Sequence, residues 1–287
     1  MKHFITYCFL KIINIFLSFI PRRIAIFCAK KTGTIISIIY PKRKKVAFKN
    51  LKIAFPQKSY KEIEYIIKRT YQHYMVLIID FLRQKKINLF KISIDSNTKR
   101  ILSSNQGLIM MTAHIGNWEM ILPILNKYKK TSAIVKIQKN TGGDKFVSQL
   151  RNFENIRLLP MGSSKRNMIK ALNNKEVLAL ASDQNAGEKG SQIMFFGKKA
   201  SIPKGAAYFY YKTKCPIAIG FCILKKDYTY EFKLEEIKPT INILDESLFT
   251  EINSIYCKKL ENIIKKHPEQ YFWFHKKWNK KIYNNKT

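Results

Sequence analysis

The stretch AHIGNWE holds the side chains of this sequence that are best suited to acid–base chemistry. Its histidine, His114, directly follows an apolar run of buried-strand length at residues 107–113 (GLIMMTA). On a regular helix His114 and Glu119 would point about 140° apart, so they converge only where the helix begins between them. Gly116 and Asn117 supply the tight turn and the N-cap candidate for such a break. The carboxylate would then hold the imidazole in one tautomer while the free ring nitrogen takes a proton from a hydroxyl nucleophile.

A second interpretation fits the same residues, namely a structural histidine hydrogen-bonded beside the start of a helix. One histidine and one carboxylate do not separate a catalytic pair from this alternative. The surrounding elements and the rest of the chain therefore have to distinguish the two interpretations.

The elements that must position His114 alternate between strands and helices after about residue 95. Apolar runs predict strands over residues 107–113, 131–137, 156–161, 177–182, 215–224 and 228–234. Helical patterns cover residues 117–128, 143–153, 165–173, 203–212 and 246–266, after an earlier helix over 59–83. This alternation predicts an α/β fold with a mainly parallel or mixed sheet flanked by helices. A histidine at the end of a buried strand then lies at the edge where such sheets bind ligands.

The N-terminal region predicts attachment to a membrane. Residues 4–20 form an apolar run at the short limit for crossing a hydrocarbon core of about 30 Å, and Lys11 makes crossing costlier. No small-residue cleavage site follows the run, so we do not expect a removed signal peptide. Polar residues recur at helical spacing along one stripe of this run: His3, Tyr7, Lys11, Asn14 and Ser18. The stripe suits a helix lying in the membrane interface, with Lys11 reaching the headgroups, at least as well as one that spans.

A second apolar stretch, residues 24–40, is followed by a basic cluster at residues 42–45. Such clusters beside an apolar helix favour the anionic cytoplasmic leaflet. We therefore expect a membrane-associated helical N-terminus over residues 1–40 and one α/β domain over residues 41–287. A pair of buried helices in a soluble domain is the alternative.

Composition limits the classes of partner. The chain has 53 Lys and Arg against 19 Asp and Glu, a net charge of +34, and is 46% hydrophobic, which excludes a disordered basic protein. The charge must lie on a folded surface, where it attracts nucleic acid, an anionic membrane or phosphorylated substrates. No nucleic-acid-binding module is recognisable, so nucleic acid is not an expected partner. The five cysteines show no CxxC spacing, and no P-loop or GxGxxG motif occurs, so we expect no metal and no cofactor.

The stretch HIGNWE after an apolar strand resembles the His-x4-Asp/Glu motif of the lysophospholipid acyltransferase-like superfamily. More specifically, the chain is similar to the late (secondary) acyltransferases of lipid A biosynthesis. Further blocks of that family follow in the same order and cover residues from about 40 to 280: RKKVAFKNLKIAFPQKS, DKFVSQLR, MIKALNNKEVLALASDQNAG, MFFG and HPEQYFWFHKKWNK. The segment KKASIPKGAA departs from the family, with Pro203 and Lys204 where threonine is common.

This resemblance implies an O-acyltransferase at the cytoplasmic face of the inner membrane. Acyl carrier protein would donate a fatty acyl chain, and a hydroxyl of a phosphorylated glycolipid, a lipid A precursor, would receive it. By the same resemblance His114 is the general base and Glu119 its orienting partner. Arg151 would stabilise the thioester oxyanion or hold a phosphate. Asp183 would position Arg151 or the substrate.

The expected substrate-binding residues are Asn117, Gln184, Phe195, Phe196, Arg166 and His275. Phe195 and Phe196 would line an acyl groove or belong to the core. Two other functions remain open at this stage. One is an acyltransferase that acts on another membrane acceptor, a lysophospholipid or a glycolipid. The other is a non-enzymatic basic protein that binds membrane or nucleic acid.

Overall fold

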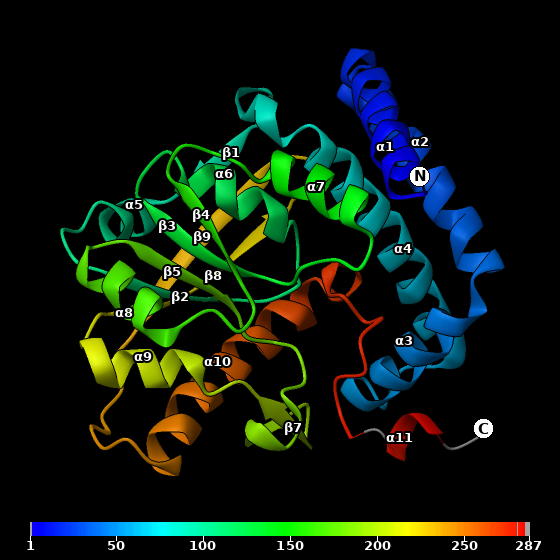
Figure 1. Cartoon of the computed structure of the whole chain (residues 1–287). Coiled ribbons are helices and arrows are strands. Elements are labelled where there is room, and N and C mark those ends of the chain that lie inside the picture. Colours follow the sequence, from blue (N-terminus) through cyan, green and yellow to red (C-terminus); the bar gives the residue numbers. More distant parts are fainter. Residues whose placement is uncertain (1, 280, 285–287) are drawn as a thin grey trace.

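The computed structural model describes residues 2–279 and 281–284, which fold around a seven-stranded sheet (Figure 1). Its strands are β1 (Ile92–Ile94), β2 (Leu108–Thr112), β3 (Thr131–Val135), β4 (Ile156–Pro160), β5 (Val177–Ala181), β8 (Ile217–Leu224) and β9 (Tyr230–Ile237). The strand order is β1-β9-β8-β2-β5-β3-β4, and β8–β9 is the one antiparallel neighbour pair in it. This is the α/β fold with a parallel-dominated mixed sheet that the alternating pattern predicts.

Helices cover both faces of the sheet. The α-helices are α1 (Lys2–Phe19), α2 (Arg22–Ile39), α3 (Pro41–Ala54), α4 (Tyr60–Leu82), α5 (Ser96–Leu102), α6 (Ile121–Leu125), α7 (Thr141–Leu150), α8 (Lys165–Asn173), α9 (Gly205–Thr213), α10 (Glu246–Lys266) and α11 (Lys281–Asn284). Short 3₁₀ helices are η1 (Gln84–Leu89), η2 (Trp118–Met120), η3 (Gly187–Lys189) and η4 (Pro268–Gln270). An antiparallel hairpin of β6 (Ser191–Phe195) and β7 (Lys198–Ile202) lies beside α10.

The continuous apolar run of β2 results from burial on both faces of the sheet. Ile109 and Met111 face the core built with α8, α9 and α10, whereas Leu108 and Met110 face the core built with α5 and α6. All four side chains are fully buried, so both faces of this part of the strand require apolar residues. The strand thereby holds its C-terminal end, and the residues that follow it, in a fixed place.

Most predicted elements are present with small shifts in their bounds, and α8 and α10 begin and end where predicted. The helix predicted over residues 117–128 is shorter, because it consists of η2 followed by the single turn and a half of α6. The β6–β7 hairpin is an element that the sequence pattern did not predict. Its turn is formed by Phe196 and Gly197, which both have positive φ angles, +49° and +70°.

The N-terminal helices pack against one side of the α/β domain rather than extending away from it (Figure 1). Helix α4 begins at a capping box between Ser59 and Glu62, and α2 packs along it. The two helices approach closely at Gly33, where a Cβ atom would lie 2.7 Å from the Cα atom of Gln72. Small residues at the contact, such as Ala25 and Ala29 on α2, allow this close approach.

Three residues of the polar stripe of α1 bond to the α/β domain, so for these three the expectation that the stripe faces lipid headgroups is wrong. His3 accepts a hydrogen bond from the backbone N–H of Thr141 (3.1 Å), and the Tyr7 hydroxyl donates to Gln149 (3.0 Å), both on α7. Further along, the Asn14 amide donates to a carbonyl of α4 (2.5 Å). These three residues face inward because their donors and acceptors find partners on the domain.

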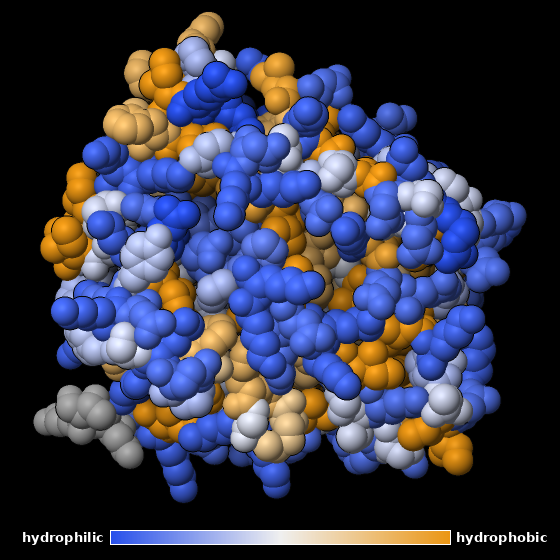
Figure 2. Space-filling model, turned by 180° about the vertical axis from the view of Figure 1, so that it is seen from behind, coloured by the Kyte–Doolittle hydropathy of each residue, from blue (hydrophilic) through white to orange (hydrophobic). Residues whose placement is uncertain are grey.

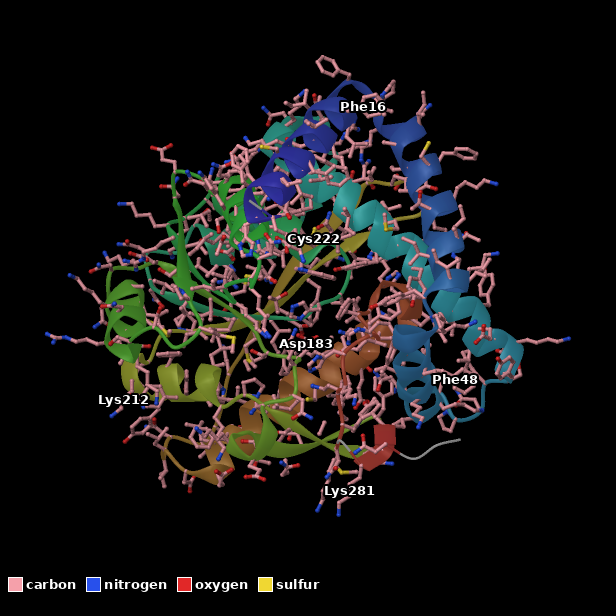
Figure 3. All side chains as sticks on the ribbon, turned by 45° about the vertical axis from the view of Figure 1, so that its right-hand side comes forward. Phe16, Phe48, Asp183, Lys212, Cys222 and Lys281 are labelled. Carbon is pink, nitrogen blue, oxygen red and sulfur yellow. The ribbon has the colours of Figure 1, made fainter. Side chains whose placement is uncertain are left out.

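The opposite face of α1 is apolar and exposed. Its outward side chains include Phe4, Phe9, Ile12, Phe16 and Phe19. Apolar residues gather over the N-terminal helices in the view from behind (Figure 2), and Phe16 points away from the body of the protein (Figure 3). Within the described residues, α1 is the one unbroken helix that is long and apolar enough to cross a membrane.

Candidate active site

The parallel pairing of β2 with β5 brings His114 and Asp183 together. Thr112 is opposite Ala181 in the ladder, and the backbone N–H of Ser182 donates to the Thr112 carbonyl (2.9 Å). Asp183 is the next residue after Ser182, and His114 is the second residue after Thr112. The imidazole Nδ1 of His114 lies 2.7 Å from Oδ1 of Asp183. Asp183 lies deep in the molecule (Figure 3), with its side chain 5% exposed, whereas His114 is 22% exposed.

The electrostatics of this pair favour a charged carboxylate beside a histidine that can accept a proton. Burial alone raises the pKa of Asp183, but the charge and hydrogen bond of His114 and the charge of Lys277 outweigh it and lower the pKa to about 2. Burial lowers the pKa of His114, and the Asp183 charge, its hydrogen bond and the Glu119 charge more than compensate, so the pKa is raised. An ionised Asp183 only accepts hydrogen bonds, so Nδ1 of His114 carries the proton and Nε2 is free to act as a base.

Glu119 binds Arg151, so the expectation that it orients His114 directly is wrong. Nε and Nη2 of Arg151 donate to the two carboxylate oxygens of Glu119 at 2.9 Å and 2.6 Å, in a bidentate pair. Arg151 caps the C-terminus of α7, and Glu119 lies in the first turn of η2. The two carboxylates have thus exchanged the partners expected of them, because Asp183 holds His114 and Glu119 holds Arg151.

Trp118 lies between the two pairs and keeps them adjacent. Its indole Nε1 donates to Glu119 (3.2 Å), and its ring packs edge-on against the imidazole of His114 with centroids 5.2 Å apart. The imidazole of His114 and the positively charged guanidinium of Arg151 therefore lie close to each other, beside the C-terminal end of β2. This arrangement suits proton abstraction beside developing negative charge.

The turn that follows His114 depends on Gly116. Its φ angle is +61°, and a Cβ atom there would lie only 2.0 Å from the carbonyl oxygen of Cys222 on β8. The Gly116 N–H donates to the carbonyl of Gln270 (3.0 Å), and its own carbonyl lies 3.0 Å from Nε2 of His73 on α4. Glycine is required here because both the φ angle and the contact exclude a side chain.

A C-terminal segment, residues 267–278, holds the loops that carry His114 and Asp183. The Phe272 N–H donates to the carbonyl of His114 (2.9 Å), and the ammonium of the buried Lys277 donates to the carbonyl of Asp183. The segment is itself held by Asn50 of α3, whose amide donates to the carbonyls of Trp273 (2.7 Å) and His275 (2.8 Å). The block HPEQYFWFHKKWNK therefore supports the site from behind.

Two of the expected substrate-binding residues lie close to His114. The exposed amide of Gln184 has its Nε2 atom 3.4 Å from Nε2 of His114. His275 is half-buried, with its Nε2 atom 3.4 Å from the N–H of Asn185. Burial lowers its pKa, and the charge of Asp183 only partly offsets this. These two positions can contact a substrate bound at His114.

The other four expected substrate-binding residues lie elsewhere. The amide of Asn117 is buried and bonded on both sides, to Tyr230 and to the N–H of Met120, so the structure contradicts a substrate contact. Phe195 is fully buried in the core, which contradicts a role in a groove. Phe196 lines a surface pocket with residues 53–58, at the end of α3 and in the loop that follows it, and His114 is not among the residues that line this pocket. Arg166 is exposed in the first turn of α8.

Several residues that position the site could not be predicted from the sequence. Lys277 lies in the recognised closing block, but its neighbours Lys276 and Lys281 are of the same type, and only the fold singles it out for burial. Asp80 and Tyr230 carried no signal beyond their places in apolar patterns. Among the described residues, no three His, Cys, Asp or Glu side chains gather as metal ligands would.

Comparisons with known proteins find the following relatives. The chain is 22% identical over 269 residues to the lipid A biosynthesis palmitoleoyltransferase of Escherichia coli K12, an alignment that covers 90% of this chain and 86% of that protein. The lipid A biosynthesis acyltransferase of Shigella flexneri matches with the same identity and coverage. Among solved structures, the 1-acyl-sn-glycerophosphate acyltransferase of Thermotoga maritima matches with a TM-score of 0.38 and 15% identity, over 86% of this chain and 97% of that one.

The family model for bacterial lipid A biosynthesis acyltransferases matches residues 1–280, almost the whole of the chain. Its extent includes both pairs of the site, the turn between them and the C-terminal segment that supports them. The chain therefore belongs to the bacterial lipid A biosynthesis acyltransferase family.

Proposed function

We propose that this protein transfers a fatty acyl chain from acyl carrier protein to a hydroxyl of a phosphorylated lipid A precursor. The observation that carries the proposal is the juxtaposition of the His114–Asp183 pair with the Arg151–Glu119 pair, in a chain of this family. The first pair supplies a base and the second a fixed positive charge. Acyl transfer to a hydroxyl needs both.

His114 is the general base of the proposed reaction. Nε2 takes the proton of the acceptor hydroxyl while Nδ1–H remains bonded to Asp183. The hydroxyl oxygen attacks the thioester carbonyl carbon, a C–O bond forms, and the carbonyl oxygen becomes an oxyanion. The C–S bond then breaks, and the departing sulfur of the carrier protein takes the proton from the imidazolium. Gln184, whose amide is next to Nε2, yields its place to the hydroxyl.

Arg151 supplies positive charge beside the reacting atoms. Its Nε and Nη2 atoms are occupied by Glu119, which fixes the plane of the guanidinium. Among the described residues, its Nη1 amino group makes no hydrogen bond, and the side chain is 21% exposed. That free edge is available to the thioester oxyanion or to a phosphate of the acceptor.

The proposed place of action is the cytoplasmic face of the inner membrane, where the exposed apolar face of α1 enters the lipid interface. This orientation keeps the hydrogen bonds of His3, Tyr7 and Asn14 to the domain, which a spanning helix would have to break. The net charge of +34 attracts anionic headgroups, and it also favours an acidic carrier protein and a phosphorylated acceptor.

The proposal is tested with purified protein, an acyl-carrier-protein thioester and an acylated glucosamine disaccharide phosphate, with the product measured by mass spectrometry. We expect one added acyl ester, and a loss of rate on the order of 10²- to 10⁴-fold in His114→Ala. Lys226→Ala, on the exposed loop between β8 and β9, is the control and should keep the wild-type rate.

Transfer to a lysophospholipid but not to the disaccharide would replace the proposed acceptor while keeping the chemistry. Near-normal turnover by His114→Ala would overturn the mechanism. Absence of transfer to either acceptor would overturn the function.

A further inference from the structure

A chain of buried hydrogen bonds connects the first turn of α2 to the turn that follows His114. Nε and Nη2 of Arg22 donate to the two oxygens of Asp80 on α4, at 2.9 Å and 2.7 Å. The Tyr230 hydroxyl donates to the same carboxylate at 2.5 Å. The amide of Asn117 donates in turn to the Tyr230 hydroxyl at 2.9 Å. Four side chains from α2, α4, β9 and the catalytic turn thus form one connected network.

The network is deeply buried and depends on Arg22 for its charge balance. Asp80 is 0% exposed, and Tyr230 and Asn117 are 1% exposed each. A carboxylate in such a place requires a paired positive charge and satisfied oxygens. Arg22 provides both, and its remaining Nη1 atom donates to the carbonyl of Tyr228 at 2.7 Å. The α2 helix therefore completes a charge pair inside the α/β domain.

The ionised Asp80 sets the direction of every bond in the network. A carboxylate only accepts hydrogen bonds, so the Tyr230 hydroxyl must donate to it and is left to accept from Asn117. The Asn117 amide is thereby turned with its NH₂ group toward Tyr230 and its oxygen toward the N–H of Met120, which it caps at 3.2 Å. A hydroxyl free to donate elsewhere would let this amide flip and would leave η2 without its cap.

The cap orients the residues on both sides of it. Asn117 directly follows Gly116, and its own N–H donates to the carbonyl of Cys222 on β8 at 2.7 Å. Before it lies the loop that presents His114, and after it Trp118 and Glu119 begin η2. A rotation at Asn117 therefore changes the relative placement of the histidine base and the carboxylate that holds Arg151. Displacements of about 1 Å in such groups can cost on the order of 10²-fold in rate.

We propose that Arg22, Asp80 and Tyr230 are positioning residues that couple the seating of the N-terminal helix α2 to the geometry of the catalytic turn. Their effect on rate rests on the proposed function, but their effect on the turn does not. None of the three touches substrate, and each acts through Asn117. Catalysis then requires that α2 remain docked against α4, so the segment that faces the membrane is also part of the support of the active site.

The decisive variant is Tyr230→Phe, which removes the hydroxyl while the ring and the Arg22–Asp80 pair remain. Tyr228→Phe is the matched control, because its hydroxyl also binds α2, accepting from Lys30, yet it has no bond to Asn117. We expect kcat to fall about tenfold or more in Tyr230→Phe with KM nearly unchanged, and no change in Tyr228→Phe.

A second readout reports on the turn without any substrate. The chain has three tryptophans, and 5-fluorotryptophan labelling gives each a ¹⁹F resonance, with that of Trp118 assigned from Trp118→Phe. Tyr230→Phe should shift or broaden the Trp118 resonance, whereas Tyr228→Phe should leave it in place. Should the wild-type protein transfer no acyl chain, the proposed function fails and the resonance still tests the network.

Two outcomes would overturn the proposal. In the first, Tyr230→Phe keeps the wild-type kcat and an unmoved Trp118 resonance. In the second, Tyr228→Phe and Tyr230→Phe lose activity equally, which would assign the effect to docking of α2 in general and not to the bond with Asn117.

Discussion

At His114, two opposing effects determine the pKa of the imidazole. Burial disfavours the charged ring and lowers the pKa, whereas the neighbouring carboxylate of Asp183 and the charge of Glu119 favour it. The attraction is the larger effect, so the pKa lies above its usual value of 6.5. A base must be unprotonated to act, and the raised pKa lowers the fraction of neutral His114 at pH 7. The same interactions make the imidazole a stronger base and fix its tautomer.

This balance predicts the pH dependence of the proposed reaction. The kcat/KM of the wild-type protein should rise with pH and reach half of its plateau above pH 6.5, because His114 must lose a proton. Asp183→Asn removes the charge that raises the pKa, so the midpoint should move to lower pH. Its plateau should fall on the order of 10²- to 10⁴-fold, because the tautomer is no longer held.

The measurement is a pH–rate profile of each variant, and Asp227→Asn on an exposed loop is the control. A midpoint that stays in place in Asp183→Asn would show that another group titrates. A midpoint that moves to higher pH would contradict the assignment of Asp183 as the partner of His114.

At the scale of elements, the site is assembled from loops that follow adjacent parallel strands and from the C-terminal segment behind them. The β2 and β5 strands bring His114 and Asp183 into register, and the segment 267–278 bonds to the backbone of both residues. Asn50 connects α3 to that segment. Its amide is fully used, since it donates twice and its oxygen accepts from the Tyr283 hydroxyl at 2.5 Å.

Asn50→Asp should weaken this attachment without changing the volume of the side chain. The carboxylate would face the carbonyls of Trp273 and His275 with no proton to donate, a buried loss of about 1–3 kcal/mol for each bond. The midpoint of thermal unfolding should fall by several degrees. Asn279→Asp, an exposed position in the same region, should leave the midpoint within error. Equal midpoints for the two variants would remove Asn50 from the support of the site.

At the scale of the whole molecule, polar and apolar surfaces are divided by the orientation of α1. Its polar stripe satisfies hydrogen bonds on α7 and α4, which leaves phenylalanine and isoleucine on the outer face beside a strongly basic surface. A face of this kind gains about 1.5–3 kcal/mol for each large side chain that it fully buries in an apolar environment. Basic residues add an attraction to anionic headgroups that salt screens.

Replacing two outward residues should therefore detach the protein from vesicles. Phe9→Ser with Phe16→Ser, at side chains of residues 61% and 65% exposed, should weaken sedimentation with anionic vesicles by about tenfold or more. Ile243→Ser with Met194→Ser, equally exposed but outside the N-terminal helices, is the matched control and should bind as the wild type does. Raising salt should weaken binding in all of these proteins. Unchanged binding of the phenylalanine variant would exclude α1 as the membrane-contacting face.

The local sequence pattern alone predicts several elements of the fold and the family of this protein. The apolar run before His114 identified a strand buried on both faces, and a histidine at the end of such a strand lies at a ligand-binding edge. Periodicity gave the bounds of α8 and α10, and spacing separated the polar stripe of α1 from its apolar face, although not which of the two faces the domain. The HIGNWE stretch and the ordered blocks indicated the family. These signals are local, so residues close in the chain are enough to carry them.

Only the tertiary structure decided which side chains meet. Glu119, five positions from His114, was the expected partner, whereas the actual partner, Asp183, lies 69 positions away. Spacing along the chain cannot reveal this, because it does not specify that β5 lies beside β2, nor the register that aligns their ends. The same holds for Asn117, which points into the buried network with Tyr230 and Asp80, and for Lys277, whose burial behind Asp183 depends on the path of the C-terminal segment. The sequence contains the imidazole and the carboxylates, but the order and register of the strands determine which of them pair.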